Sequence, residues 1–159
     1  PIAAGAWPVR ILAGALGDGL PTRDLRLSPG HPVLVGADAD GDGGHLVPIV
    51  CLINGTTVAR EPVEAITYWH VELDGHDILR AEGLLAESYL DLGDRGFFDE
   101  GGDHPLADPD LVPPGVGARC RPVAIDGPVV ERERRRLDAV FATRLAAACD
   151  WPDVRAALL

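Results

Sequence analysis

The stretch LSPGHPVLV at residues 27–35 decides the fold of this chain, because it places a tight turn directly before a buried strand. Pro29 presets φ, and Gly30 supplies the positive φ that such a turn needs. The apolar run after it is short and begins at a turn, which is typical of a strand inside a β-sheet. Turn chemistry does not explain His31, which enters the mouth of the strand, so the remaining sequence has to decide whether this histidine is structural or chemical.

Short apolar runs between turn residues recur over the first hundred residues. The chain has 19 glycines and 14 prolines, which separate these runs at regular intervals, as is typical of an all-β fold. We predict a twisted fold of short antiparallel strands, in which the pair Asn54-Gly55 is the strongest two-residue hairpin signal. The predicted strands are residues 8–13, 24–27, 31–35, 45–52, 56–60, 63–73 (long enough to bend), 77–81 and 84–89.

The sequence changes character after residue 98. Residues 99–127 are irregular and rich in Gly, Pro and Asp, which is typical of a linker or a draped loop. Helical spacing of apolar residues then follows. The predicted organisation is a partial β-domain at 1–98, an irregular linker at 99–127 and a helical tail at 128–159.

The helical tail has the signals of a helix start. Asp126 lies near the N-cap position and Pro128 fits the first turn, and the helix should run to about Cys149. We expect the tail to be dispensable for chemistry, although one apolar stripe lets it dock on the β-domain or on a neighbour. The expected docking residues are Leu137, Val140, Phe141 and Leu145.

The charge balance restricts the partners of the chain. With 14 basic and 25 acidic residues the formal net charge is −11, and the pI is about 4.7. On electrostatic grounds we expect no nucleic-acid partner and no docking on anionic membranes. No stretch reaches the roughly 18 consecutive apolar residues of a membrane span, and no secretory signal pattern is found. Either the bacterial cytoplasm or export fits this composition.

The cysteines do not indicate a metal centre or a disulfide framework. Cys51, Cys120 and Cys149 are an odd number at wide spacing, so we expect reduced thiols and no zinc site. The motif DADGDG at 38–43 matches the opening of an EF-hand loop, but Ile49 stands where that loop needs a bidentate Glu. An acidic hairpin loop is the better interpretation.

Residues 68–83, YWHVELDGHDILRAEG, hold most of the candidate chemistry. Strand alternation would place His70, Glu72 and Asp74 on one face, and a turn at Asp74-Gly75 would then present His76. Imidazole and carboxylate groups suit zinc or iron. An exposed polar strand face is the commoner arrangement, and we predict no bound metal or other cofactor.

Residues 8–98 resemble the Hint module of hedgehog C-terminal domains, inteins and bacterial intein-like proteins. Ser28, Pro29, Gly30 and His31 resemble the Thr-x-x-His box of that family, with Ser in place of Thr. The late motif of the family runs from a Tyr through an apolar strand to a His and a short strand. The residues that match this late motif are Tyr68, Val71, Leu73, His76, Ala81 and Gly83.

The resemblance implies an all-β Hint fold and self-processing. In such a module a Cys or Ser attacks the carbonyl that precedes it, and an N-to-S or N-to-O acyl shift results. His31 would protonate the departing nitrogen, since a histidine titrates near neutrality and can act as an acid and a base. Ser28 would orient His31 or bond the scissile amide, and His76 would assist the second cleavage or the resolving step. His70 and Glu72 would be auxiliary groups.

Three departures limit the chemistry that the resemblance implies, and one of them is Trp69, which stands where the family often has an Asp after the late-motif Tyr. Residue 1 is Pro, which cannot be the nucleophile, so the nucleophile is expected upstream of this chain, in the polypeptide that is also the substrate. Ala86, Glu87 and Ser88 stand where inteins have a His-Asn pair, so complete splicing is not expected. The acceptor would then be water, a thiol or another nucleophile.

Two alternatives stay open. The chain could be a non-catalytic domain of the same shape that serves in binding or scaffolding. It could also be a small metal-dependent hydrolase that uses His31, His70, Glu72 and His76.

Overall fold

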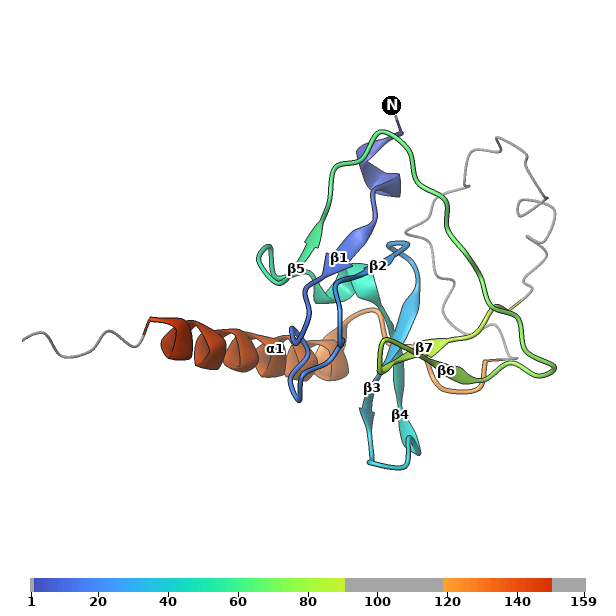
Figure 1. Cartoon of the computed structure of the whole chain (residues 1–159). Coiled ribbons are helices and arrows are strands. Elements are labelled where there is room, and N and C mark those ends of the chain that lie inside the picture. Colours follow the sequence, from blue (N-terminus) through green and yellow to red (C-terminus); the bar gives the residue numbers. More distant parts are fainter. Residues whose placement is uncertain (1, 91–118, 150–159) are drawn as a thin grey trace, which may run out of the picture.

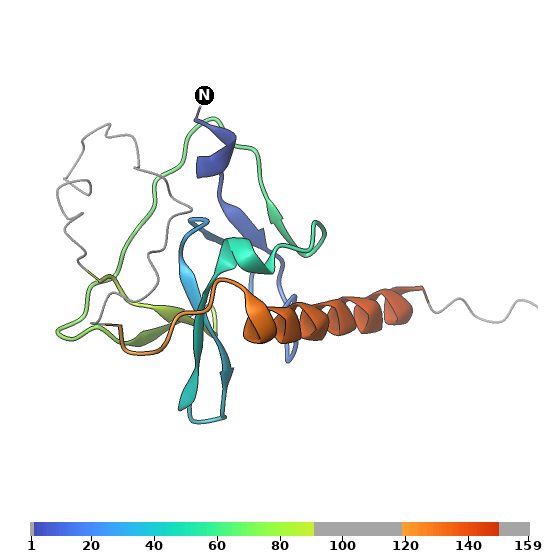
Figure 2. The same ribbon diagram turned by 180° about the vertical axis from the view of Figure 1, so that it is seen from behind.

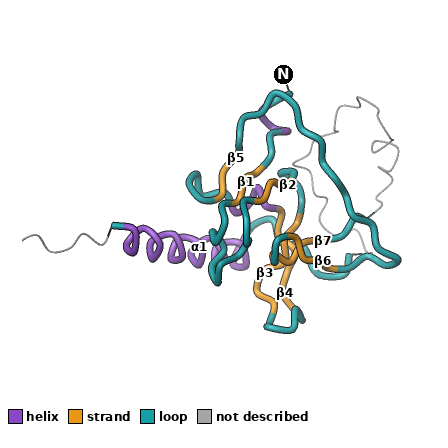
Figure 3. Tube along the Cα trace, viewed as in Figure 1, coloured by secondary structure: helices purple, strands orange, loops and turns teal. Residues whose placement is uncertain are grey.

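The computed structural model describes residues 2–90 and 119–149. Most of the predicted linker and the last residues of the predicted tail therefore lie outside the described residues. Figures 1 and 3 show a β-rich body from which one helix projects. The elements are η1 (Ala4–Ala6), β1 (Val9–Ile11), β2 (Leu25–Leu27), β3 (Pro32–Ala37), β4 (Gly43–Pro48), η2 (Ile49–Leu52), β5 (Val58–Arg60), β6 (Ile78–Ala81), β7 (Leu84–Glu87) and α1 (Gly127–Ala148).

The strands form two small antiparallel sheets. One sheet has the order β2-β1-β5 and the other the order β4-β3-β7-β6. The link between β2 and β3 is the Ser28–His31 turn, so this turn carries the chain from the first sheet to the second. The predicted all-β fold with a helical tail is confirmed, and seven of the eight predicted strand segments contain a strand.

The predicted strand at 63–73 is wrong. This segment, which we call the strap, leads from β5 to β6 across the body (Figure 1) and forms no strand ladder with the part of the chain that the structure describes. The apolar residues of this segment also form no buried face, as a strand would require, because Trp69, Val71 and Leu73 are 87%, 54% and 42% exposed. Periodicity predicts which faces a strand would have, but a strand also needs a neighbour with which to pair.

The predicted strand at 45–52 ends early, because β4 stops at Pro48 and the chain continues as η2. The Asn54 side chain then holds the following turn, where Oδ1 accepts hydrogen bonds from the backbone N–H groups of Thr56 (3.0 Å) and Val58 (3.0 Å). The turn was predicted correctly, but it joins η2 to β5 rather than two strands. The acidic stretch 38–43 is the loop between β3 and β4, as predicted.

The hydrophobic core lies between the sheets and the first half of α1. It includes residues of β1, β3, β4, η2, β5 and β7, and Val130 and Leu137 of α1 belong to the same cluster. Val130 is 2% exposed and Leu137 is 1% exposed. The N-terminal part of the helix therefore belongs to the same core as the strands, and of the two expected docking partners it packs on the β-domain.

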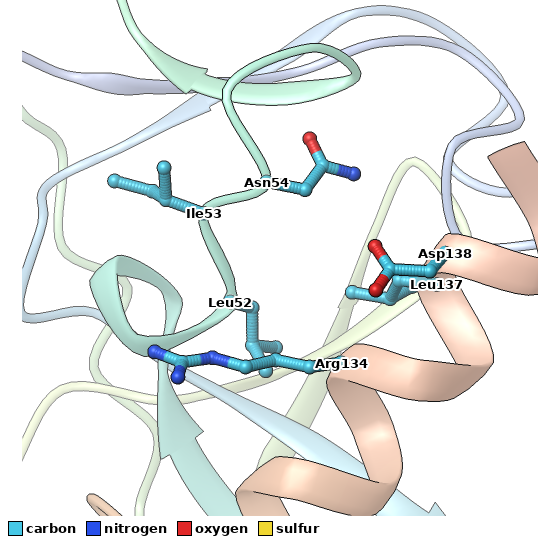
Figure 4. A pocket seen from close by; sticks show the side chains of 6 residues that line it. All are labelled: Leu52, Ile53, Asn54, Arg134, Leu137 and Asp138. Carbon is cyan, nitrogen blue, oxygen red and sulfur yellow. The ribbon is translucent and has the colours of Figure 1, made fainter.

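The docked part of α1 extends from its N-terminus to about Phe141. Leu137 is buried as predicted and Val140 and Phe141 are partly buried, whereas Leu145 is 50% exposed, and the far half of the helix projects from the body (Figure 2). A groove of about 390 Å³ lies between α1 and residues 52–54 (Figure 4). Across it, Arg134 Nε donates to the Cys51 carbonyl at 2.6 Å. Among the described residues no helix is both long and apolar enough to span a membrane.

Candidate functional site

The Ser28–His31 turn is held by its own backbone and by η2. The N–H of His31 donates to the Ser28 carbonyl at 3.0 Å. The N–H groups of Val50 and Ile49 donate to the carbonyls of Pro29 and His31, each at 3.0 Å. Because these groups are satisfied on both sides, the turn fixes the angle at which His31 enters β3.

The His31 ring lies against the end of β7. β3 pairs antiparallel with β7, with Val33 opposite Ala86, so Glu87 lies opposite Pro32, one position from His31. The ring N–H of His31 donates to the backbone carbonyl of Glu87. Burial lowers the pKa of His31 to about 4, with a smaller lowering from the nearby charge of His70. His31 is therefore neutral at pH 7.

His70 joins His31 to the strap. The ring centroids of His31 and His70 are 6.2 Å apart, and the edge of His70 faces Tyr89 at 5.9 Å. The N–H of Tyr89 donates to the Val71 carbonyl at 2.7 Å, which fastens the strap to the chain after β7. The strap is also tied to η1, which precedes the first sheet, because the Tyr68 hydroxyl donates to the Ala6 carbonyl at 3.0 Å. His70 is thus held beside His31 without a strand ladder.

His76 is buried on the side-chain side of Glu87. Its Nε2 lies 3.0 Å from Glu87 Oε1, and the backbone N–H of Cys120 donates to its Nδ1 at 2.9 Å. An Nδ1 that accepts a hydrogen bond is unprotonated, so the hydrogen-bond network assigns the neutral tautomer with its proton on Nε2. Both ring nitrogens of His76 are therefore engaged.

Glu87 is the residue that connects the two histidines. Its backbone carbonyl accepts from His31, and its carboxylate accepts from His76. The carboxylate also pairs with Nη1 of Arg119. The side chains of His76, Glu87 and Arg119 are 7%, 7% and 8% exposed, so this is a buried charged cluster.

The sequence analysis did not identify Glu87 and Arg119. A carboxylate inside an otherwise apolar strand is the signal that could have found Glu87, because buried charges are nearly always paired. Arg119 had no such signal, since it lies in a stretch predicted as linker.

The structure brings some of the predicted site residues together. His31 and His70 are neighbours, and His76 reaches them through Glu87. The Ser28 hydroxyl has no hydrogen-bond partner within residues 2–90 and 119–149, so it does not orient His31 directly in this structure. Glu72 lies exposed on the strap.

The alternative of a metal-dependent hydrolase has no set of metal ligands in the described part of the chain. No group of three or more His, Cys, Asp or Glu residues lies close enough there to hold a metal ion. His31 and His70 form one pair, while His76 is engaged with Glu87 and Cys120.

The described residues form two small antiparallel sheets, joined by a turn that places His31 beside His70. This arrangement defines an all-β module of the hedgehog/intein type. The chain belongs to the Hint-domain family, whose model matches residues 1–93. No curated protein and no solved structure matches it significantly. The family that the sequence resembles is therefore confirmed. Arg119 and Cys120, which complete the buried cluster, lie beyond the matched residues.

Proposed function

We propose that this Hint module takes part in self-cleavage of the polypeptide that contains it. The nucleophile would be a Cys or Ser N-terminal to Pro1, and the reaction would be an N-to-S or N-to-O acyl shift. The substrate would be the polypeptide itself, and the final acceptor would be water, a thiol or another nucleophile. Membership of a family that includes autoprocessing modules supports this general chemistry.

The state of the His31 ring supports the chemistry most directly. A neutral imidazole that donates its N–H to the Glu87 carbonyl has an unprotonated second nitrogen, which can accept a proton. The nucleophile would pass its proton to this nitrogen as its sulfur or oxygen bonds to the scissile carbonyl carbon. The imidazolium so formed is a strong acid, because burial opposes its charge.

The same proton then completes the step. When the tetrahedral intermediate collapses, the C–N bond breaks and the imidazolium returns the proton to the departing nitrogen, which leaves a thioester or ester and a free amine. His31 would thus act first as a base and then as the acid that the sequence predicts. The Ser28 hydroxyl, which has no hydrogen-bond partner among the described residues, would bond the scissile amide, the second of the two roles predicted for it.

The remaining predicted residues have more limited roles. His76 was expected to assist the resolving step, and proton transfer by it would require that one of its two hydrogen bonds break. His70 would act through its contact with His31. Complete splicing is not proposed, because residues 86–88 contain no Asn.

The decisive experiment is the intact mass over time of the complete encoded polypeptide, including any residues that precede Pro1. His31→Ala should abolish cleavage. His45→Ala, a substitution on β4 away from the site, is the matched control and should cleave at the native rate. A single uncleaved mass in all samples, with and without added thiol, would exclude self-cleavage.

That negative outcome would favour the binding alternative, for which the strap offers one specific observation. Trp69, Val71 and Leu73 are all exposed there, and exposed apolar side chains close together are typical of interaction surfaces. A loss of cleavage in His45→Ala as well would indicate a general loss of structure rather than a role for His31.

A further inference from the structure

Residues beyond the family-matched region reach into the candidate site. The match ends at residue 93, yet Nη1 of Arg119 pairs with the Glu87 carboxylate and the N–H of Cys120 donates to His76 Nδ1 at 2.9 Å. Both contacts are buried, and both go to residues that the family-matched module supplies. The module is therefore completed by a segment that follows it in the chain.

This segment is placed by main-chain pairing with β4. The N–H of Leu46 donates to the Pro122 carbonyl at 2.8 Å, and the N–H of Ala124 donates to the Leu46 carbonyl at 2.9 Å. Val123 thus forms a parallel bridge with Leu46. Four residues after Val123, α1 begins at Gly127 and packs Val130 into the core. Arg119 accordingly lies four residues before a backbone that is paired with β4, and directly before Cys120, whose N–H is bonded to His76.

The ion pair between Arg119 and Glu87 matters because the Glu87 carboxylate is buried. A buried carboxylate without a compensating cation is strongly unfavourable, and it must move toward water or take up a proton. Either change alters the side chain that orients His76. It also disturbs the backbone whose carbonyl receives the His31 N–H, because both groups belong to the same residue.

We propose that Arg119 is a positioning residue for the histidine pair: by holding the Glu87 carboxylate, it fixes the Nε2–H tautomer of His76 and the carbonyl that orients His31. The role in cleavage rests on the proposed function above, whereas the effect on the two rings does not. Residues that follow the Hint module are on this basis part of its active site.

The test compares Arg119→Met with two other variants. Arg119→Lys keeps the cation, and because the contact uses one nitrogen on one oxygen, a lysine can replace it. Arg23→Met removes a guanidinium that pairs with Glu82 at an exposed position and is the matched control. Imidazole ¹⁵N spectra of the chain report the tautomers of His31 and His76, and intact mass of the complete polypeptide reports cleavage.

We expect Arg119→Met to shift the ring signals of His31 and His76 and to slow cleavage by about ten- to a hundredfold, the effect of a small misplacement at a reacting centre. Arg119→Lys should restore most of the rate and the native ring signals. Arg23→Met should change neither. Native ring signals together with a native rate in Arg119→Met would overturn the positioning role.

If Arg119→Met destabilises the fold, the double variant Glu87→Gln/Arg119→Met separates that effect from the effect on cleavage, because it removes the buried unpaired charge. Cleavage that stays slow while stability recovers supports positioning. Cleavage that recovers together with stability would show that Arg119 only compensates a charge, and would refute the proposal. If the wild-type polypeptide does not cleave, the proposed function fails, and the ring signals alone decide the role of Arg119.

Discussion

Replacing Leu137 by alanine is expected to lower the free energy of unfolding by about 2–3 kcal/mol. The side chain is 1% exposed and belongs to the core cluster shared with the strands. Loss of a buried leucine typically costs about 2–5 kcal/mol, and the cost rises with the sealed cavity left behind. Leu137 lines the groove of about 390 Å³ in Figure 4, so truncation enlarges an existing opening, which places the cost in the lower half of that range.

Leu145→Ala is the matched control on the same helix. Its side chain is 50% exposed, so the change should stay within about 0.5 kcal/mol. Urea unfolding of the full chain, followed by helical circular dichroism and by tryptophan fluorescence, measures both variants. Equal costs for Leu137→Ala and Leu145→Ala would refute the docking of the N-terminal half of α1. Two separate transitions in the wild type would instead show that the helix unfolds independently of the β-domain.

Three further predictions concern the site and its hairpin. Since the pKa of His31 is about 4 when folded and near 6.5 when unfolded, the unfolded chain binds more protons between these values. The free energy of unfolding should therefore include the full contribution of neutral His31 above pH 6.5 and fall by about 3 kcal/mol toward pH 4. In a pH series of unfolding curves, His31→Gln should lack this fall. Ser28→Ala should slow cleavage less than His31→Ala, and equal slowing by intact mass would give the hydroxyl an equal role. Gly44→Ala should destabilise more than the control Gly36→Ala in thermal melts: both have positive φ, but the new Cβ at 44 would lie 2.6 Å from the Val35 carbonyl, whereas nothing lies within 4 Å at 36.

The sequence predicted the strands where local turn chemistry sets their ends. The Ser28–His31 turn and the Asn54 turn are both present. Gly55 has the positive φ that its turn favours, whereas Gly30 does not have the positive φ that the sequence predicted for it. The two errors concern contacts between distant residues. The segment at 63–73 alternates like a strand but has no pairing neighbour in the described structure, and the run at 45–52 changes to η2 where its N–H groups turn to the carbonyls of the His31 turn.

The candidate site was predictable only in part, for the same reason. His31 follows from a turn of four residues, whereas the cluster around His76 depends on contacts 11 and 32 residues from Glu87. A short stretch of sequence does not indicate contacts between residues so far apart in the chain. The approach of the His31 ring to the Glu87 carbonyl depends on the register of β3 on β7, in which Glu87 lies opposite Pro32, and no local sequence pattern fixes that register.

The neutral state of His31 also bears on the chemical identity of the nucleophile in the proposed cleavage. With a pKa of about 4, its imidazole is a weak base. Taking a proton from a thiol of pKa about 8.5 costs about 6 kcal/mol, and an alcohol, a much weaker acid, would cost far more. We therefore expect a cysteine at the cleavage position, and its replacement by serine in the complete polypeptide should nearly stop the acyl shift. Cleavage at a comparable rate with serine would mean that His31 is not the group that accepts the proton.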